Sequence, residues 1–188
     1  VDARAHGDSE GTKIGMGWPE RVDIIKWINL ILSWEPNARI VLHGVSMGAA
    51  TVLMASGEDL PGNVKAVIAD CGYTSEWDEF RREADALHIP WFPVLNATSV
   101  LSKIRDGYDF KQASALAQVK KSRIPTLFIH GSSDELVPYS MLGELYAAAA
   151  CEKEELTVEG AGHALSSSVA PTLYWRTVED FIAKYLDR

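Results

Sequence analysis

The chain has 188 residues, of which 47% are apolar and 23% are charged, with 14 Gly and 8 Pro. This composition excludes a disordered or collagen-like chain, and the length fits one domain with a real hydrophobic core. The formal net charge of -8 repels phosphate backbones, so we expect no nucleic-acid partner. No apolar run approaches the ~20 residues of a membrane span.

The two cysteines, Cys71 and Cys151, are too few for a disulfide framework and have no CxxC spacing. We interpret both as reduced thiols, which favours a cytoplasmic location. The first residues, Val1–Ala5, have neither the basic nor the apolar pattern of a targeting signal.

Short β-branched runs alternate with helical patterns along the chain. Buried strands are predicted at Arg39–His43, Val64–Asp70, Thr126–His130 and Glu155–Val158. Helices are predicted at Pro19–Trp34, Met47–Ser56, Ser140–Ala150 and Thr172–Leu186. This order predicts an α/β fold: a parallel sheet with helices on both faces.

One connection is too long for a simple crossover. Ser75–Pro125 spans 51 residues, whereas a parallel crossover needs about a dozen. It contains a predicted helix at Glu76–Leu87 and a further helix ending near Arg105. Because it leaves the carboxyl end of one strand and returns before the next, we expect a helical cap insertion above the edge where ligands bind. The alternative is an extra helical layer with no binding role.

The strongest local signal is Gly44-Val45-Ser46-Met47-Gly48, between a predicted strand and a predicted helix. A strand, sharp turn and helix around a G-x-S-x-G sequence form a nucleophile elbow, in which the serine hydroxyl is exposed on a strained backbone. Glycine on either side is expected to let the strand and helix approach closely. The Met47 N–H, at the helix N-terminus, then faces a developing oxyanion. A chance occurrence of the motif is the alternative.

A serine hydroxyl is a poor nucleophile until a base takes its proton. His163 meets this need, because it follows the last predicted strand in the glycine-rich loop Val158–Ala164. The other histidines fit worse and are expected to be structural. They are His6 near the amino terminus, His43 and His130 inside strands, and His88 in the insertion.

A carboxylate must hold that imidazole in the right tautomer. Asp134 is the first candidate, because it follows the third predicted strand and gives the chain order Ser, Asp, His. Asp70, at the end of the second predicted strand, is the competing candidate. Its alternative role is to accept backbone hydrogen bonds in the turn that follows.

These motifs together resemble those of α/β-hydrolase fold serine hydrolases, of the serine aminopeptidase-like and prolyl oligopeptidase-like branch. Asp2–Gly11 resembles the D-x-R-G-H-G-x-S loop, with Ala5 in place of the usual Gly. The elbow, an H-G-x-x-D-x-x-V-P acid loop at His130–Pro138 and a G-x-G-H loop at Gly160–His163 follow in the same order. The resemblance covers the whole chain and implies a single domain over residues 1–188.

The resemblance also implies that this domain is incomplete at its amino terminus. In the family, the opening loop follows the fourth strand of an eight-stranded sheet. The earlier part would supply the second oxyanion N–H, and no H-G-G-G-like stretch lies between Gly11 and Ser46. The strand Arg39–His43 is apolar on both faces like an interior strand, so we expect self-association through its exposed edge.

The predicted function is that of a serine hydrolase of carboxylesterase or peptidase type. It would cleave an ester, thioester or amide bond of a small ester or short peptide through Ser46, His163 and Asp134, with Met47 in the oxyanion hole. We expect no metal, because no cluster has ligand spacing, and no nucleotide cofactor, because neither GxGxxG nor GxxxxGK[ST] occurs. The alternative function is that of a non-catalytic hydrolase remnant that binds a partner.

Overall fold

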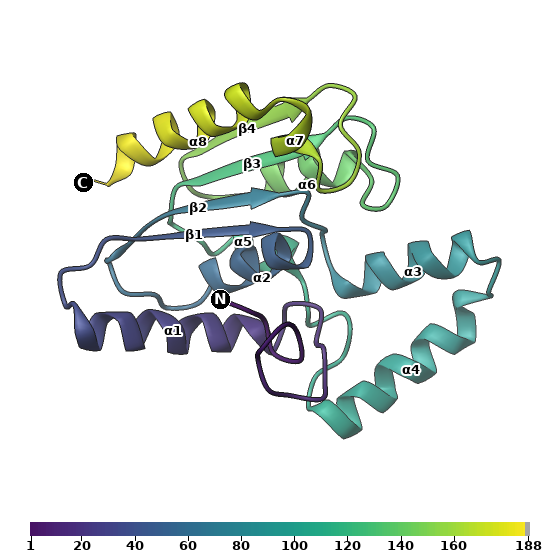
Figure 1. Cartoon of the computed structure of the whole chain (residues 1–188). Coiled ribbons are helices and arrows are strands. Elements are labelled where there is room, and N and C mark those ends of the chain that lie inside the picture. Colours follow the sequence, from purple (N-terminus) through teal and green to yellow (C-terminus); the bar gives the residue numbers. More distant parts are fainter. Residues whose placement is uncertain (187–188) are drawn as a thin grey trace.

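The computed structural model describes residues 1–186. One parallel sheet runs in the order β1-β2-β3-β4, and the carboxyl ends of its strands lie at the same edge (Figure 1). The strands are β1 Ile40–Val45, β2 Val64–Asp70, β3 Thr126–Gly131 and β4 Lys153–Val158. This confirms the predicted parallel α/β fold.

The helices are α1 Glu20–Trp34, α2 Met47–Ser56, α3 Glu76–Ala86, α4 Trp91–Asp106, α5 Ala115–Val119, α6 Ser140–Ala148, α7 Ser166–Val169 and α8 Pro171–Tyr185. Two short helices, α5 and α7, were not predicted, because one turn or so of helix carries too little periodicity to recognise. In α5 the side chain of Ser114 caps the first turn by accepting from the Ala117 N–H at 3.1 Å.

The sheet separates two hydrophobic cores, one on each face. Val67 and Ala69 of β2 belong to the core shared with α1, α2, α5 and α6, whereas Ala66 and Ile68 pack with α8. This alternation follows from the two-residue period of a strand. Figure 1 shows α8 on one side of the sheet and α1 and α2 on the other, which confirms helices on both faces.

Strand β1 forms one edge of the sheet within residues 1–186, where its ladder partner is β2 alone. The prediction that this strand is covered on both faces is wrong. Ile40 and Leu42 are buried, but His43 and Val45 are exposed. On the α8 side of the sheet, the only residue of β1 that packs against the hydrophobic core is the partly buried Val41, within residues 1–186.

The segment between β2 and β3 projects from the carboxyl end of the sheet, where α3 and α4 extend beyond the strands (Figure 1). Its base is closed by an isolated antiparallel bridge between Ser75 and Ser114. Ser75 also caps α3, because its side chain accepts from the Asp78 N–H at 3.0 Å. The role of this insertion as a cap stays a prediction.

Within residues 1–186, no helix combines the length and the apolar character that crossing a bilayer would need.

Candidate active site

Ser46 occupies the sharp turn between β1 and α2. Its backbone has φ 55° and ψ -119°, a region that residues with a Cβ rarely adopt. A Cβ on Gly44 would lie 2.2 Å from the Gly48 carbonyl oxygen, so only glycine fits at position 44. A Cβ on Gly48 would meet no neighbouring atom within 4 Å. The expectation that both glycines provide space therefore holds for Gly44 alone.

The Ser46 hydroxyl lies against the imidazole of His163. Ser46 Oγ and His163 Nε2 are 2.7 Å apart, although the residues are 117 positions apart in sequence. His163 comes from the loop after β4, which packs closely on the loop after β3. The Ser133 N–H donates to the Ala161 carbonyl at 3.0 Å, and a Cβ on Gly131 would lie 2.2 Å from the same oxygen.

Asp134 lies on the other side of the imidazole, and its side chain is fully buried. Its Oδ2 is 2.9 Å from His163 Nδ1. Its Oδ1 accepts from the backbone N–H groups of Leu136 and Val137, at 3.0 and 2.9 Å. The carboxylate is therefore anchored by its own loop on one oxygen and offers the other oxygen to His163.

His130, which the sequence predicts to be structural, also contributes to this site. It is 1% exposed, and its Nε2 lies 3.0 Å from the Val137 carbonyl and 3.2 Å from Asp134 Oδ2. The signal that could have found it is its position four residues before Asp134, at the end of the strand that leads into the Asp134 loop.

Asp70, the competing carboxylate, has other partners. The Ser166 hydroxyl donates to its Oδ1 at 3.2 Å, and its backbone carbonyl accepts from the Ser46 N–H at 2.8 Å. Burial raises the pKa of the Asp70 carboxyl, while hydrogen bonds from Ser166 and Tyr174 act in the opposite direction. Of the two carboxylates, the structure thus places Asp134 beside His163 Nδ1. Asp70 instead contacts the elbow, through the hydrogen bond from the Ser46 N–H to its backbone carbonyl.

The remaining histidines lie away from this cluster. His43 Nε2 is 3.0 Å from the Tyr174 hydroxyl, and partial desolvation of the ring lowers the pKa of this imidazole. His6 Nδ1 lies 2.9 Å from the Arg4 carbonyl in the amino-terminal loop. His88 is exposed between α3 and α4.

Cys71 directly follows β2 and is 1% exposed. Its φ of 50° is unusual for a residue with a side chain. Burial, and then the Asp70 charge, raise the pKa of this thiol to about 12. Metal-ligating atoms of Cys71, Asp134 and His163 all lie within 4.8 Å of one another. The sequence indicates no role for Cys71, because its proximity to Asp134 and His163 arises only from the fold.

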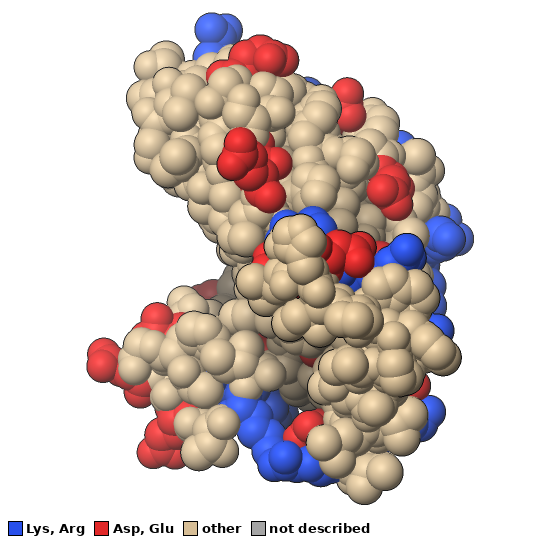
Figure 2. Space-filling model, turned by 90° about the vertical axis from the view of Figure 1, so that its right-hand side faces the viewer, with Lys and Arg blue, Asp and Glu red and all other residues tan. Residues whose placement is uncertain are grey.

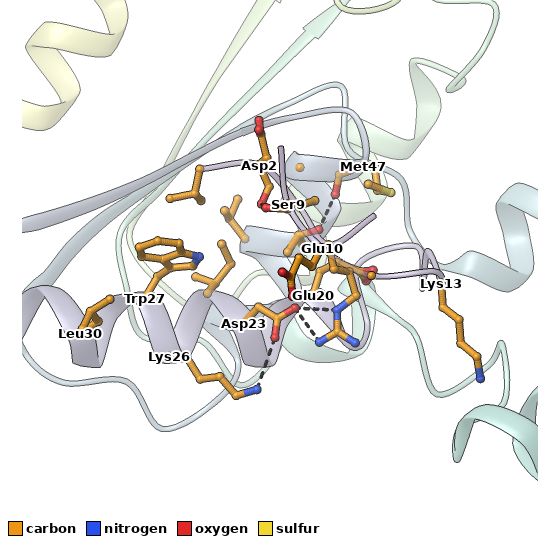
Figure 3. A pocket seen from close by; sticks show the side chains of 18 of the residues that line it. Asp2, Ser9, Glu10, Lys13, Glu20, Asp23, Lys26, Trp27, Leu30 and Met47 are labelled. Atoms are coloured by element: carbon orange, nitrogen blue, oxygen red, sulfur yellow. Dashed lines mark hydrogen bonds and ion pairs between the residues drawn. The ribbon is translucent and has the colours of Figure 1, made fainter. Parts of the chain in front are cut away.

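A groove of about 850 Å³ runs between the amino-terminal segment, α1 and α2, beside β1. Met47 lies at its edge, and Trp27 and Leu30 line it from α1 (Figure 3). Arg4 and Asp23 form an ion pair at its polar end. Ser46, Asp134 and His163 are not among the residues that line this groove, so it adjoins the elbow at Met47 rather than at these three side chains.

The fold is that of the α/β hydrolases. The esterase Pf2001 of Pyrococcus furiosus superposes with a TM-score of 0.76 over 98% of this chain and 69% of that chain, at 21% identity. An acylaminoacyl peptidase of Pyrococcus horikoshii gives a TM-score of 0.69 over 91% of this chain and 28% of that chain, at 19% identity.

Sequence comparison places the chain more narrowly. Residues 20–188 match the prolyl oligopeptidase family, to which the chain belongs. The Bacillus subtilis protein YqkD is 31% identical over 185 residues, which cover 96% of this chain and 60% of that protein. The α/β-hydrolase domain-containing protein WAV2 of Arabidopsis thaliana is 29% identical over 97% of this chain and 59% of that protein. The chain thus spans about 60% of the length of these relatives.

Proposed function

We propose that this protein is a serine hydrolase in which Ser46 is the nucleophile, His163 the base and Asp134 the residue that orients the base. The observation that carries the proposal is the continuous contact from Ser46 Oγ to His163 Nε2, at 2.7 Å, and from His163 Nδ1 to Asp134 Oδ2, at 2.9 Å. Both distances are within hydrogen-bond reach, as proton transfer requires.

The chemistry begins when Ser46 Oγ attacks a carbonyl carbon and its proton passes to His163 Nε2. The Met47 N–H, in the first turn of α2, stabilises the oxyanion together with the positive end of the helix dipole. His163 then gives the proton to the leaving group as the bond to it breaks. Water, activated by the same imidazole, releases the acyl group and restores the serine.

The proposed substrates are small esters, thioesters or short peptides. Charged side chains of both signs are scattered over the end of the molecule that bears the insertion, and most of that surface is uncharged (Figure 2). Such a surface favours neutral or weakly charged substrates over polyanions. The family and the structural neighbours include both an esterase and peptidases, so either leaving group fits.

The proposal is tested by labelling with a fluorophosphonate, which reacts only with an activated serine. We expect one labelled residue, Ser46, and no labelling of Ser46→Ala. Ser132→Ala is the matched control, because this serine lies in the neighbouring loop and hydrogen-bonds Glu159. A folded wild-type chain that resists labelling would favour the alternative, a non-catalytic hydrolase remnant that binds a partner.

A further inference from the structure

Cys71 has a relationship to the candidate active site that the proposed reaction does not use. Its sulfur lies with Asp134 and His163 in a cluster whose ligand atoms are within 4.8 Å of one another. Cys71 directly follows β2, and its backbone N–H donates to the Ile129 carbonyl of β3 at 2.9 Å. The sulfur therefore lies beside the side chains of Asp134 and His163, at the carboxyl end of the sheet.

We propose that Cys71, Asp134 and His163 form an inhibitory binding site for a thiophilic divalent cation, of which Zn²⁺ is the representative. The ligand set of one sulfur, one nitrogen and one oxygen is of the kind that zinc takes, with water at the fourth position. A thiolate and an imidazole in the set disfavour Mg²⁺ and Ca²⁺, which prefer oxygen ligands.

The geometry needs only a small adjustment. Zinc bonds of ~2.0 to 2.3 Å place two ligand atoms of one ion roughly 3.5 Å apart in a tetrahedral site. The Asp134 side chain is anchored through two backbone N–H groups, and the main chain of Cys71 is anchored directly after β2, so the remaining adjustment falls to the Cys71 and His163 side chains. His163 has the most freedom to move, because its side chain is 18% exposed and Gly160 and Gly162 precede it.

Binding forms one bond each from zinc to sulfur, nitrogen and oxygen. Water leaves the hydrated ion, and the thiol proton of Cys71 passes to solvent, so no oxidant or reductant is needed. The imidazole of His163, once bound to zinc, can no longer both contact Asp134 and take the Ser46 proton. The loss of activity rests on the proposed function, whereas the binding of the ion does not.

The chain supplies a matched control, because Cys151 is its second and last cysteine. Zn²⁺ is titrated against ester hydrolysis and phosphonate labelling in wild type, Cys151→Ser, Cys71→Ser and Cys71→Ala. Removal of even an outer-shell partner typically weakens metal binding about 10- to 100-fold, so both Cys71 variants should resist zinc at least about tenfold more than wild type. Cys151→Ser should remain sensitive, Mg²⁺ should have no effect, and a chelator should restore activity.

A second readout does not depend on activity. Cd²⁺ added to the folded protein should produce the ultraviolet charge-transfer band of a cadmium–thiolate bond in wild type and Cys151→Ser, and not in either Cys71 variant. His163→Ala should weaken cadmium binding while retaining the thiolate. The proposal is overturned if the Cys71 variants remain as sensitive to zinc as wild type, or if wild type gives no band with cadmium. A band in a protein that hydrolyses nothing would refute the proposed function and leave the metal site standing.

Discussion

His130 and Asp134 meet inside the protein, with His130 Nε2 3.2 Å from Asp134 Oδ2 and 3.0 Å from the Val137 carbonyl oxygen. A carbonyl can only accept, so Nε2 carries the hydrogen and donates it to Val137, which places this N–H beside Asp134 Oδ2. Asp134 Oδ2 therefore bonds the His163 imidazole and lies close to the His130 N–H, while Oδ1 receives two backbone N–H groups. Donor groups thus surround both oxygens of this buried carboxylate and fix its orientation.

His130 should therefore act as a positioning residue for the proposed triad. We expect His130→Leu to lower kcat about 10- to 100-fold, with a much smaller change in KM, because a misplaced catalytic group costs rate rather than binding. His130→Asn keeps an N–H donor and should recover part of that loss. His88→Asn is the control, since His88 is exposed and asparagine tolerates its φ of 56°. Equal losses in the leucine and asparagine variants would argue against this role.

Substitutions of the two carboxylates near the elbow, Asp134 and Asp70, should affect turnover and stability differently. Asp134→Asn should lower turnover by about 10⁴-fold, as expected when the imidazole is held in the wrong tautomer, and thermal stability should fall too, because an amide NH₂ would face other donors. Asp70→Asn should act mainly on stability, because its carboxyl bonds Ser166. Steady-state kinetics and thermal melts on both variants check this. A large kinetic loss in Asp70→Asn with little effect of Asp134→Asn would move the acid to Asp70.

Substitution of the two elbow glycines by alanine should have different effects on stability. Gly44→Ala places a Cβ 2.2 Å from a backbone oxygen, so we expect a loss of about 3 kcal/mol or more in the free energy of unfolding, with slower labelling of Ser46. Gly48→Ala meets no neighbour within 4 Å and should change stability by less than about 1 kcal/mol. Chemical denaturation of the pair measures the difference. Comparable losses would mean that the elbow is not closed by the Gly44 contact.

Glu76, the first residue of α3, should make stability depend on pH. Its side chain is buried and its Oε2 has no hydrogen-bond partner among the described residues. Burial, and then the charges of Glu20 and Asp106, raise the pKa of this carboxyl to about 8. The folded state therefore holds a proton that the unfolded state releases near pH 4.5.

Because the folded state binds this proton more tightly, its contribution to stability is complete below about pH 4.5 and is lost as pH rises to about 8. Glu76→Gln stays neutral at every pH, so we expect it to remove this contribution to the pH dependence of the free energy of unfolding. At pH 9 the variant should be more stable than wild type by a few kcal/mol. Denaturation curves from pH 5 to pH 9 check this. Parallel pH profiles for wild type and variant would show that Glu76 is ionised in the folded protein.

The open edge of β1 should support self-association, and we propose a second copy of the chain as its partner. Within the described residues its ladder partner is β2 alone, and an unpaired edge without charged side chains is a template for another strand. Light scattering should give a dimer or larger species. A lysine on an edge strand blocks such pairing, so His43→Lys should yield monomers, while Leu173→Lys, at an exposed position of α8, should not. A monomeric wild type would refute this.

The strands and the candidate site could be predicted because each carries its own local signal. The turn glycines around Ser46, the acid loop with Asp134 and the glycine-rich loop with His163 are short patterns whose backbone demands are readable in sequence. The proximity of His130 and Cys71 to these groups is not local, since it depends on how two loops and the end of β2 pack. The exposure of His43 and Val45 on β1 was not predicted for the same reason. The apolar pattern of a strand is the same whether or not a neighbouring element covers it.

Ser46 and its imidazole partner are 117 positions apart in sequence, and the carboxylate comes from a third loop. On the proposed mechanism, a chain still emerging from the ribosome carries a serine that is chemically inert until the loop after β4 has been made and has closed over the elbow. Synthesis therefore cannot produce a partly built hydrolase that attacks its surroundings. The rate at which a phosphonate reacts with a refolding or nascent chain would accordingly report when the loop after β4 brings His163 to Ser46.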